Sequence, residues 1–373
     1  MAKHNAANTR IKREYFQYLR EANRRDDASI DAVAKALSRF EESNGHKDFK
    51  TFHREQAVAF KRKLDDATAV RTGEKLARAT VHSTLSALRA FFVWLAGQPG
   101  YKSKLHYGDA DYFNLSDKDV RIAKAARAKT APTLDQIHRL LSVMPRATDI
   151  EKRNRALIAF TILTGARHGA LASLKMKHIN LEQGCVDQDA RDVRTKASKS
   201  FSTWFFPVGG DALSIFTDWC HHLRTALQWG DDDALFPPTK VGVGKSGGFA
   251  PVGLRREGWE SAGPICAIFR TAFEAAGLPY FNPHSFRHTL VMHGERVCTS
   301  PEQFKAWSQN LGHGDVLTTF TSYGTVPAHR QGEVIRALGV NNSDDDNDDA
   351  LAKTIAAALR KHGHNNREGG FAV

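Results

Sequence analysis

Several short elements in the second half of the 373-residue chain carry basic or hydrogen-bonding side chains at defined places. Arg167 follows a glycine that ends a predicted helix, and Lys196 lies at the tip of a predicted hairpin. The run His284–Arg287 opens another helix, His313 follows the end of a later one, and Tyr323 comes ten residues after His313. Guanidinium and ammonium groups bind anions such as phosphate. Each element is common by itself, but together they indicate chemistry on an anionic substrate.

Three other motifs suggest chemistries that their neighbouring residues argue against. The run Gly242–Ser246 resembles the end of a phosphate-binding loop, but two prolines stand where the preceding strand should be, so we predict a flexible surface loop. His284 and His288 have the spacing of zinc ligands on a helix, but an arginine lies between them and would repel a cation. Ser285 lacks the glycine pattern of a hydrolase nucleophile. No metal site is therefore predicted.

The chain is basic, with 53 Lys and Arg residues against 41 Asp and Glu residues and a formal net charge of +12. The tail from Asn341 holds six acidic and four basic residues, so the rest of the chain is more basic than the total suggests. An excess of this size makes a polyanion the first partner to consider. A hydrophobic fraction of 41% and a charged fraction of 25% are typical of a globular protein.

Cysteine spacing and hydropathy indicate a cytoplasmic protein. The longest apolar run, Ala90–Ala96, is much shorter than the roughly 18 residues of a membrane span, and the first residues lack the apolar stretch of a secretory signal. The cysteines form no paired motif, which favours a reducing compartment over a disulfide scaffold or a cysteine zinc site. They are Cys185, Cys220, Cys266 and Cys298.

The length predicts two domains, each large enough to bury a core. Residues 1–113 are expected to form a helical bundle, because apolar residues recur at three- and four-residue spacing in Ile30–Phe40 and Val81–Leu95. Ser29 and Gly45 suit the start and the end of the first of these two helices.

A basic segment, residues 114–131, is expected to link the two domains. Its bases recur every three residues, so a helix here would carry most of its positive charge along one stripe. Two interpretations stay open, a solvated surface helix and a strap that lies along phosphates and releases their counterions. The bases are Lys118, Arg121, Lys124, Arg127 and Lys129.

The second domain, residues 132–340, is expected to combine helices with a small β-region. Thr133–Gln136 has the pattern of a capping box at a helix start. Strands are predicted where β-branched and aromatic residues gather, at 185–188, 192–195 and 202–208. The further helices are predicted at 154–163, 169–174, 265–276, 285–296 and 301–311. Residues 341–373 are expected to form an acidic linker and a short amphipathic helix.

In this order and at these separations, the motifs resemble the tyrosine recombinase family, also called phage integrases. The resemblance rests on Thr-Gly-Ala-Arg within Ile162–Leu174, the hairpin lysine, the His-x-x-Arg-His box at 284–288, and Leu-Gly-His followed by Thr-Thr and Tyr over Leu311–Tyr323. It covers roughly residues 132–338. It implies a mainly α fold with a small antiparallel β-sheet (α+β), in which a helical core-binding domain and a mixed catalytic domain form a C-shaped clamp on DNA.

The same resemblance implies a role for each motif residue. Arg167 and Arg287 correspond to the two arginines that clamp the scissile phosphate. Lys196 corresponds to the hairpin lysine, which suits a general acid for the leaving 5′-oxygen. His284 is the first residue of the histidine box and His313 is the late histidine, and a histidine near the nucleophile can accept its proton.

The nucleophile is expected to be Tyr323. Only Tyr280 and Tyr323 of the seven tyrosines lie in the second domain, and the family's nucleophile follows the histidine box, whereas Tyr280 precedes it. Two features depart from the family pattern. Ala170 stands where the family usually has an acidic residue, and the gap between His313 and Tyr323 is one residue longer than the most common family spacing.

The family also implies a reaction and a set of partners. A 3′-phosphotyrosyl intermediate keeps the bond energy, so no metal or other cofactor is required. Exchange through a Holliday junction calls for a homotetramer on duplex DNA with inverted-repeat core sites, with accessory directionality or DNA-bending factors as further partners. The chain is thus expected to integrate or excise a mobile element in the bacterial nucleoid. Arg89 and the basic segment are expected DNA contacts, and the tail helix is expected to pack on its own domain or on a neighbouring protomer.

Two alternative functions stay open. A type IB topoisomerase-like or telomere-resolving relative would share the chemistry without the strand exchange, and relaxation of a supercoiled plasmid without a specific site would identify the topoisomerase. A DNA-binding protein whose catalysis has lapsed would form no covalent adduct with DNA.

Overall fold

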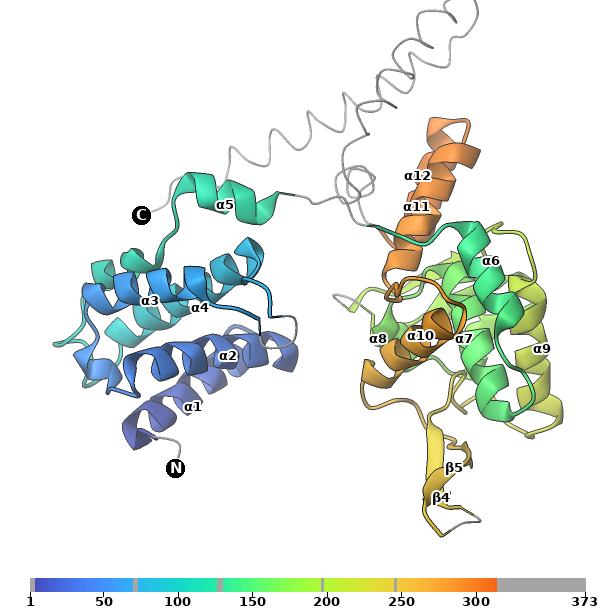
Figure 1. Cartoon of the computed structure of the whole chain (residues 1–373), viewed down its shortest axis with the longest axis horizontal. Coiled ribbons are helices and arrows are strands. Elements are labelled where there is room, and N and C mark those ends of the chain that lie inside the picture. Colours follow the sequence, from blue (N-terminus) through green and yellow to red (C-terminus); the bar gives the residue numbers. More distant parts are fainter. Residues whose placement is uncertain (1–3, 70–72, 126–129, 196–197, 245–246, 314–373) are drawn as a thin grey trace, which may run out of the picture. The chain divides into compact units, whose positions relative to one another are not determined.

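The computed structural model describes residues 4–69, 73–125, 130–195, 198–244 and 247–313. The chain divides into two compact units, Met1–Ala125 and Ala126–Val373, which are described separately below (Figure 1). Within the described residues the first unit contains helices only, apart from an isolated bridge between Thr68 and Lys75, and the second unit adds two small antiparallel sheets. The fold class expected from the sequence, mainly α with a small antiparallel sheet, is confirmed.

The first unit is built from five α-helices and two short 3₁₀ turns in its described part. Both ends of α2 are capped. At its start Asp26 accepts the backbone N–H of Ser29, and at its end Gly45 adopts the left-handed conformation with φ +69°. Asp26, rather than the predicted Ser29, is therefore the N-cap. The elements are α1 (Ala6–Glu21), α2 (Asp27–Asn44), η1 (Phe49–Thr51), α3 (Arg54–Asp66), α4 (Arg78–Ala96), η2 (Tyr107–Phe113) and α5 (Asp117–Lys124).

Aromatic side chains fill the core of the first unit. Phe40 on α2 and Phe92 on α4 are almost fully buried, and their ring centroids lie 5.4 Å apart in an edge-to-face arrangement. Phe52 stacks on Phe92 with 3.9 Å between the ring centroids. Such pairs stabilise the core by about 0.5–1.5 kcal/mol each beyond the burial of apolar area. The helical stripe predicted for α4 is thus a core-facing stripe.

Helix α5 lies inside the segment that the sequence predicts to be a linker. It packs on α4, and the first unit extends through it to Ala125. Ser116 caps the helix by accepting the N–H of Asp119. Lys118, Arg121 and Lys124 are exposed along it. The other two bases of the segment, at 127 and 129, lie outside the described residues.

The second unit begins with helices joined by short turns. Thr133 and Gln136 form the predicted capping box at the start of α6 (Leu134–Val143), and Thr148 and Glu151 form a second one at the start of α7 (Asp149–Thr164). The later helices are α8 (His168–Leu171), η3 (Met176–His178), α9 (Ala212–Thr225), α10 (Gly263–Ala275), α11 (Ser285–Val297) and α12 (Pro301–Asn310). Strands β1 (Ile179–Asn180), β2 (Cys185–Gln188) and β3 (Phe201–Trp204) pair in the order β1-β2-β3, and β4 (Thr239–Val243) pairs with β5 (Phe249–Leu254).

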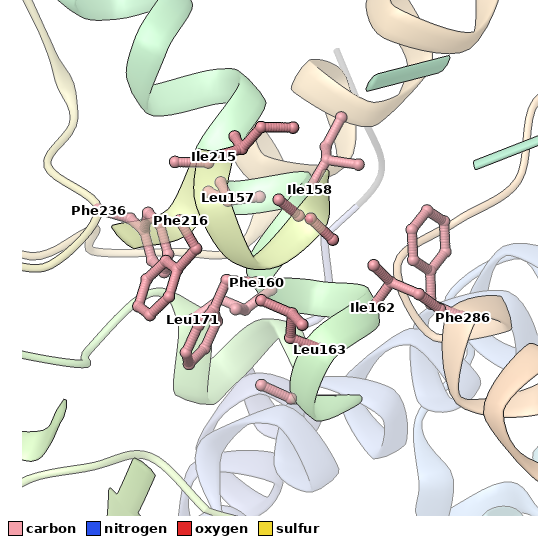
Figure 2. Packing of buried hydrophobic residues seen from close by; sticks show 14 of the residues in the cluster. Leu157, Ile158, Phe160, Ile162, Leu163, Leu171, Ile215, Phe216, Phe236 and Phe286 are labelled. Carbon is pink, nitrogen blue, oxygen red and sulfur yellow. The ribbon is translucent and has the colours of Figure 1, made fainter. Parts of the chain in front are cut away.

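Helix α7 is the central element of this unit. Every residue from Ala156 to Thr164 is buried, so the helix is covered on all sides rather than along one stripe. Figure 2 shows Phe160 of α7 beside Phe216 of α9, and Ile162 beside Phe286 of α11. The Phe160 and Phe216 ring centroids are 4.7 Å apart. This packing fixes the end of α7, from which the Thr-Gly-Ala-Arg segment emerges.

Several predicted elements differ from the observed ones. Residues 192–195 form no strand, because β2 pairs directly with β3. The described residues between these two strands form turns and irregular backbone. The prediction of a flexible loop at Gly242–Ser246 is wrong for Gly242 and Val243, which belong to β4. Helix α9 was not predicted, although Ile215, Phe216, Trp219 and Leu223 mark its buried face. In the described part of the chain no helix is both long enough and apolar enough to cross a bilayer.

Candidate functional site

Four of the predicted residues come together where the ends of α7 and α12 meet the start of α11. Arg287 and His313 are hydrogen-bonded to each other at 3.0 Å. Arg167 and His284 lie close enough for their charges to act on the His313 ring. The four residues come from parts of the chain up to about 150 positions apart. The structure therefore gathers these motif residues at one site.

Arg287 holds the site together from inside the protein. Only 2% of the residue is exposed. Its guanidinium donates hydrogen bonds to the carbonyl oxygens of Gly165, which ends α7, and Leu311, which ends α12. Helix C-termini present carbonyls with partial negative charge, so a cation is stabilised there. Arg287 thus fixes the Arg167 segment and the His313 segment relative to α11.

His313 is held as a neutral ring. Burial first, and then the positive charges of Arg287, Arg167 and His284, lower the pKa of His313 to about 4. Because a guanidinium can only donate, the Nε2 atom of His313 accepts the hydrogen bond from Arg287 and the ring proton is on Nδ1. At neutral pH this histidine is therefore an uncharged ring whose Nε2 atom is held by Arg287.

Gly165 allows the chain to turn sharply between α7 and Arg167. Its φ of +59° is left-handed, and a Cβ atom here would lie 3.0 Å from side-chain carbons of both Leu290 and Leu311. Any other residue would meet both backbone strain and crowding. Arg167 follows as the N-cap of the short helix α8 and is partly exposed.

His284 lies on the solvent side of the site. It is exposed and occupies the N-cap position of α11. The preceding turn is closed by Asn282, whose carbonyl oxygen accepts the Ser285 hydroxyl at 2.6 Å. An anion approaching the buried Arg287 would meet His284 and Arg167 first, because these two side chains are the more exposed ones.

An arginine that sequence reasoning missed anchors the connection between β2 and β3. The Arg194 guanidinium donates to the carbonyl oxygens of Ala172 (3.2 Å), Glu260 (2.8 Å) and Trp259. Its backbone N–H donates to the Ser173 hydroxyl at 2.9 Å. Lys196 itself lies outside the described residues, but the chain is fastened to the α8 region two positions before it. No local pattern identifies these partners, which come from segments more than 20 and 60 residues away.

Ala170, which replaces the acidic residue of the family pattern, is 1% exposed and belongs to the apolar core. The adjacent Gly169 lies against the Arg194 carbonyl, since a Cβ atom on it would be 3.1 Å from that oxygen. The hydrogen bonds between the end of α8 and the β2–β3 connection run from the Arg194 guanidinium to the Ala172 carbonyl and from the Arg194 backbone N–H to the Ser173 hydroxyl.

The remaining predicted residues divide into described and undescribed ones. Tyr323 and the tail from residue 341 lie outside the described residues. The alternative tyrosine, Tyr280, has its ring 4.9 Å from the Arg270 guanidinium. Arg89, an expected DNA contact, donates two hydrogen bonds to Asp111 at 2.7 and 3.0 Å, so its charge is already partly balanced.

The described residues contain no cluster of three or more His, Cys, Asp or Glu side chains that could hold a metal ion. The cysteines Cys185, Cys220, Cys266 and Cys298 are all free thiols. Burial raises the pKa of Cys220 to about 12, so this thiol is inert as a nucleophile at neutral pH.

Comparisons with known proteins agree with this geometry. Residues 132–326 match the Phage integrase family. The tyrosine recombinase XerC of Escherichia coli O157:H7 (strain EC4115 / EHEC) is 30% identical over 254 residues, which cover 67% of this chain and 72% of XerC. The tyrosine recombinase XerD of Neisseria meningitidis serogroup A / serotype 4A is 25% identical over 248 residues, or 65% of this chain and 71% of XerD.

Solved structures share the fold. A lambda integrase dimer bound to a COC′ core site matches with a TM-score of 0.57 at 14% identity, covering 85% of this chain and 95% of that chain. XerH recombinase bound to its difH substrate matches with a TM-score of 0.54 at 16% identity, covering 89% of this chain and 85% of that chain. With the family match over more than half of its length, the chain belongs to the phage integrase family, the tyrosine recombinases.

Proposed function

We propose that this recombinase cuts and rejoins duplex DNA through a 3′-phosphotyrosyl intermediate formed on Tyr323. As a member of its family the chain is a site-specific DNA recombinase. The observation that carries the finer proposal is the gathering of Arg167, Arg287, His284 and His313 at one site.

The two arginines suit the scissile phosphate. A phosphodiester resists attack because its anionic oxygens repel nucleophiles and gain charge in the transition state. Guanidinium groups are permanently charged and offer paired donors to phosphate oxygens. By analogy with other preorganised donors, each arginine contributes about 3–4 kcal/mol to the transition state. Arg287 is already fixed by two helix ends, so little ordering is needed when the phosphate arrives.

His313 supports activation of the nucleophile. A phenol with a pKa near 10 is only about 0.1% ionised at pH 7, a deficit of about 4 kcal/mol. The positive charges of the site favour the phenolate. For His313 to take the phenol proton, its Nε2 atom must exchange the hydrogen bond from Arg287 for one from Tyr323. Because the pKa of His313 is lowered to about 4, the ring is uncharged throughout the neutral range but is a weak base, so the nearby cations carry most of the activation.

Lys196 completes the reaction as the general acid. The Tyr323 oxygen forms a bond to phosphorus while the bond to the 5′-oxygen breaks, and that oxygen takes a proton from the lysine. An alkoxide is a poor leaving group, so the proton is needed at the moment of cleavage. The fixed position of Arg194 supports this role, because it sets where the lysine-bearing connection leaves the protein.

Strand exchange follows if the freed 5′-hydroxyl of a partner strand attacks the phosphotyrosine. Two rounds would pass through a Holliday junction within a homotetramer, with inverted-repeat core sites on the DNA. The solved relatives include a lambda integrase tetramer bound to a Holliday junction. The chain would thereby integrate or excise a mobile element in the bacterial nucleoid, with accessory factors setting direction. On α5, the exposed Lys118, Arg121 and Lys124 would follow the DNA backbone.

The tail of residues 341–373 would couple protomers in this assembly. An apolar groove of about 730 Å³ lies between β3 and the α11–α12 pair, lined by residues that include Trp204, Phe206 and Trp307. We assign it to the tail helix of a neighbouring protomer. Deleting residues 341–373 should leave single-strand cleavage largely intact but impair recombination, and unchanged recombination would overturn this assignment.

A suicide substrate tests the reaction. DNA with a 5′-bridging sulfur at the cleavage position traps the covalent intermediate, because the released thiol religates poorly. The wild type and the matched control Tyr280→Phe should both form a protein–DNA adduct, and Tyr323→Phe should form none. The absence of adduct with every variant would favour the lapsed DNA-binding protein. Relaxation of a supercoiled plasmid without a specific site would instead favour the topoisomerase-like alternative.

A further inference from the structure

The hairpin of β4 and β5 presents an apolar face that the described residues leave uncovered. It projects from the body of the second unit (Figure 1). Val243 pairs with Phe249 and Val241 pairs with Pro251, so these four side chains share one face of the ribbon. Val241 is 53% exposed, Val243 72% and Phe249 88%. A phenylalanine this exposed on a protruding ribbon indicates a binding surface rather than core packing.

The charge of the hairpin is entirely positive. Residues 234–256 contain no aspartate or glutamate but include Lys240, Lys245, Arg255 and Arg256. Arg256 is used within the protein, because its guanidinium donates to the carbonyls of Leu227 and Gln228. Lys240 and Arg255 are exposed. A partner of this surface must therefore tolerate apolar contact and carry negative charge.

The base of the hairpin is fixed to the core of the second unit. Arg153 of α7 is 1% exposed and donates hydrogen bonds to the Pro237 carbonyl and to the Thr239 hydroxyl, the latter at 3.0 Å. Its guanidinium also lies 5.0 Å from the Trp259 ring. Burial lowers the pKa of Arg153 to about 10, so the group stays charged at neutral pH. The ribbon is therefore an arm with an anchored base.

The same anchor places the hairpin near the candidate site. The chain that leaves β5 reaches Trp259, whose backbone N–H donates to the carbonyl of Ala172 at 2.9 Å, and Ala172 ends the short helix α8 that begins at Arg167. A six-residue strand at about 3.3 Å per residue extends about 20 Å from this base. At 3.4 Å per base pair, that reach corresponds to about six base pairs of duplex.

We propose that the β4–β5 hairpin enters a groove of the duplex beside the cleavage site, with Phe249 and Val243 against the bases and Lys240 on a phosphate. Two-stranded ribbons fit DNA grooves, and apolar side chains act as wedges between base steps. A second copy of the chain is the less suitable partner, because two ribbons without any acidic residue repel each other. The proposal rests on the proposed function only in taking duplex DNA as the substrate.

The test measures DNA binding separately from the cleavage chemistry. A fluorescent 40-base-pair duplex of mixed sequence is titrated with the Tyr323→Phe protein and with two further variants in that background, Val243→Ser/Phe249→Ser and Lys240→Ala. The matched control is Leu213→Ser on α9, which removes another half-exposed apolar side chain. The four substituted side chains, at 213, 240, 243 and 249, are all exposed. The thermal unfolding midpoints of the three variants should therefore equal that of the Tyr323→Phe parent.

We expect the double serine variant to bind about tenfold more weakly and Leu213→Ser to bind unchanged. Lys240→Ala should lower the slope of log Kd against log salt concentration by about one. Equal affinity and equal slope for all variants would overturn the proposal. The proposal would also be overturned if sedimentation in the absence of DNA showed that the hairpin variants lose self-association and nothing else. Failure of the phosphotyrosyl chemistry would appear in the adduct assay and leave these binding results unaffected.

Discussion

Replacing Arg194 by alanine should slow DNA cleavage specifically at the step that needs Lys196. The guanidinium joins the lysine-bearing connection to the carbonyls of Ala172, Trp259 and Glu260. Among the described residues, only the Arg194 side chain donates to all three carbonyls, so its removal breaks the link to Trp259 and Glu260 and weakens the link to the segment at Ala172. The backbone hydrogen bond from Arg194 to Ser173 remains and keeps the start of the connection in place.

The size of the effect follows from the lost hydrogen bonds. Hydrogen bonds to charged groups contribute about 1.5–3 kcal/mol each in mutational series. Arg194 is exposed and its three bonds share one guanidinium, so we expect about 1–3 kcal/mol in total rather than their sum. If this free energy no longer favours the productive lysine position, cleavage slows about 5- to 150-fold.

The leaving atom distinguishes this mechanism from general damage. A thiol with a pKa near 8.5 leaves as thiolate without a proton, so DNA with a 5′-bridging sulfur does not need the general acid. Arg194→Ala and Lys196→Ala should both be slow on ordinary DNA and near wild-type rate on the sulfur substrate. Arg191→Ala is the matched control, because Arg191 lies on the same connection and pairs only with Asp189 among the described residues. Equal slowing of Arg194→Ala on both substrates would refute the reasoning.

Three further predictions concern stability. The folded-state pKa of His313, about 4, lies below its ordinary value near 6.5, so the unfolded chain binds more protons between these values and stability falls as pH falls through that window. Urea unfolding should show a loss of about 3 kcal/mol between pH 7 and pH 4 that His313→Gln removes. Gly165→Ala should cost more in thermal unfolding than Gly45→Ala, because both glycines have positive φ but only Gly165 is crowded, and equal costs would contradict this. Arg153→Met should cost about 1–3 kcal/mol by leaving the Pro237 carbonyl without its donor, and should speed hydrogen exchange in β4 and β5.

The local signals in the sequence were sufficient for most helices and for the fold class. The capping box at Thr133 and the glycine at 45 act within one helical turn, so their patterns predict where α6 starts and α2 ends. The motifs around Arg167, His284, Arg287 and His313 were also legible, because the family resemblance fixes their order. Their convergence at one site is a tertiary result that the resemblance implied and the structure describes.

Features that depend on distant segments were not predictable in the same way. Arg194 looks like any exposed arginine in a turn, and only folding brings Ala172 and Trp259 to it. Gly242 and Val243 of β4 fall in a segment predicted as a loop, because its glycines weaken the alternating pattern, while pairing with β5 supplies the missing stability. The lowered pKa of His313 depends on three cations that lie far apart in the sequence.

Backbone carbonyls orient arginines of the described site, in which Ala170 stands where the family usually has an acidic residue. Among the described residues, every charged group that acts on the His313 pKa is a cation, and Ala170 is buried among apolar side chains. Arg287 donates to backbone carbonyls at two helix ends, and Arg194 donates to backbone carbonyls of two loops. Carbonyls orient a guanidinium without neutralising it. In the proposed mechanism, guanidinium groups oriented in this way bind the scissile phosphate of DNA.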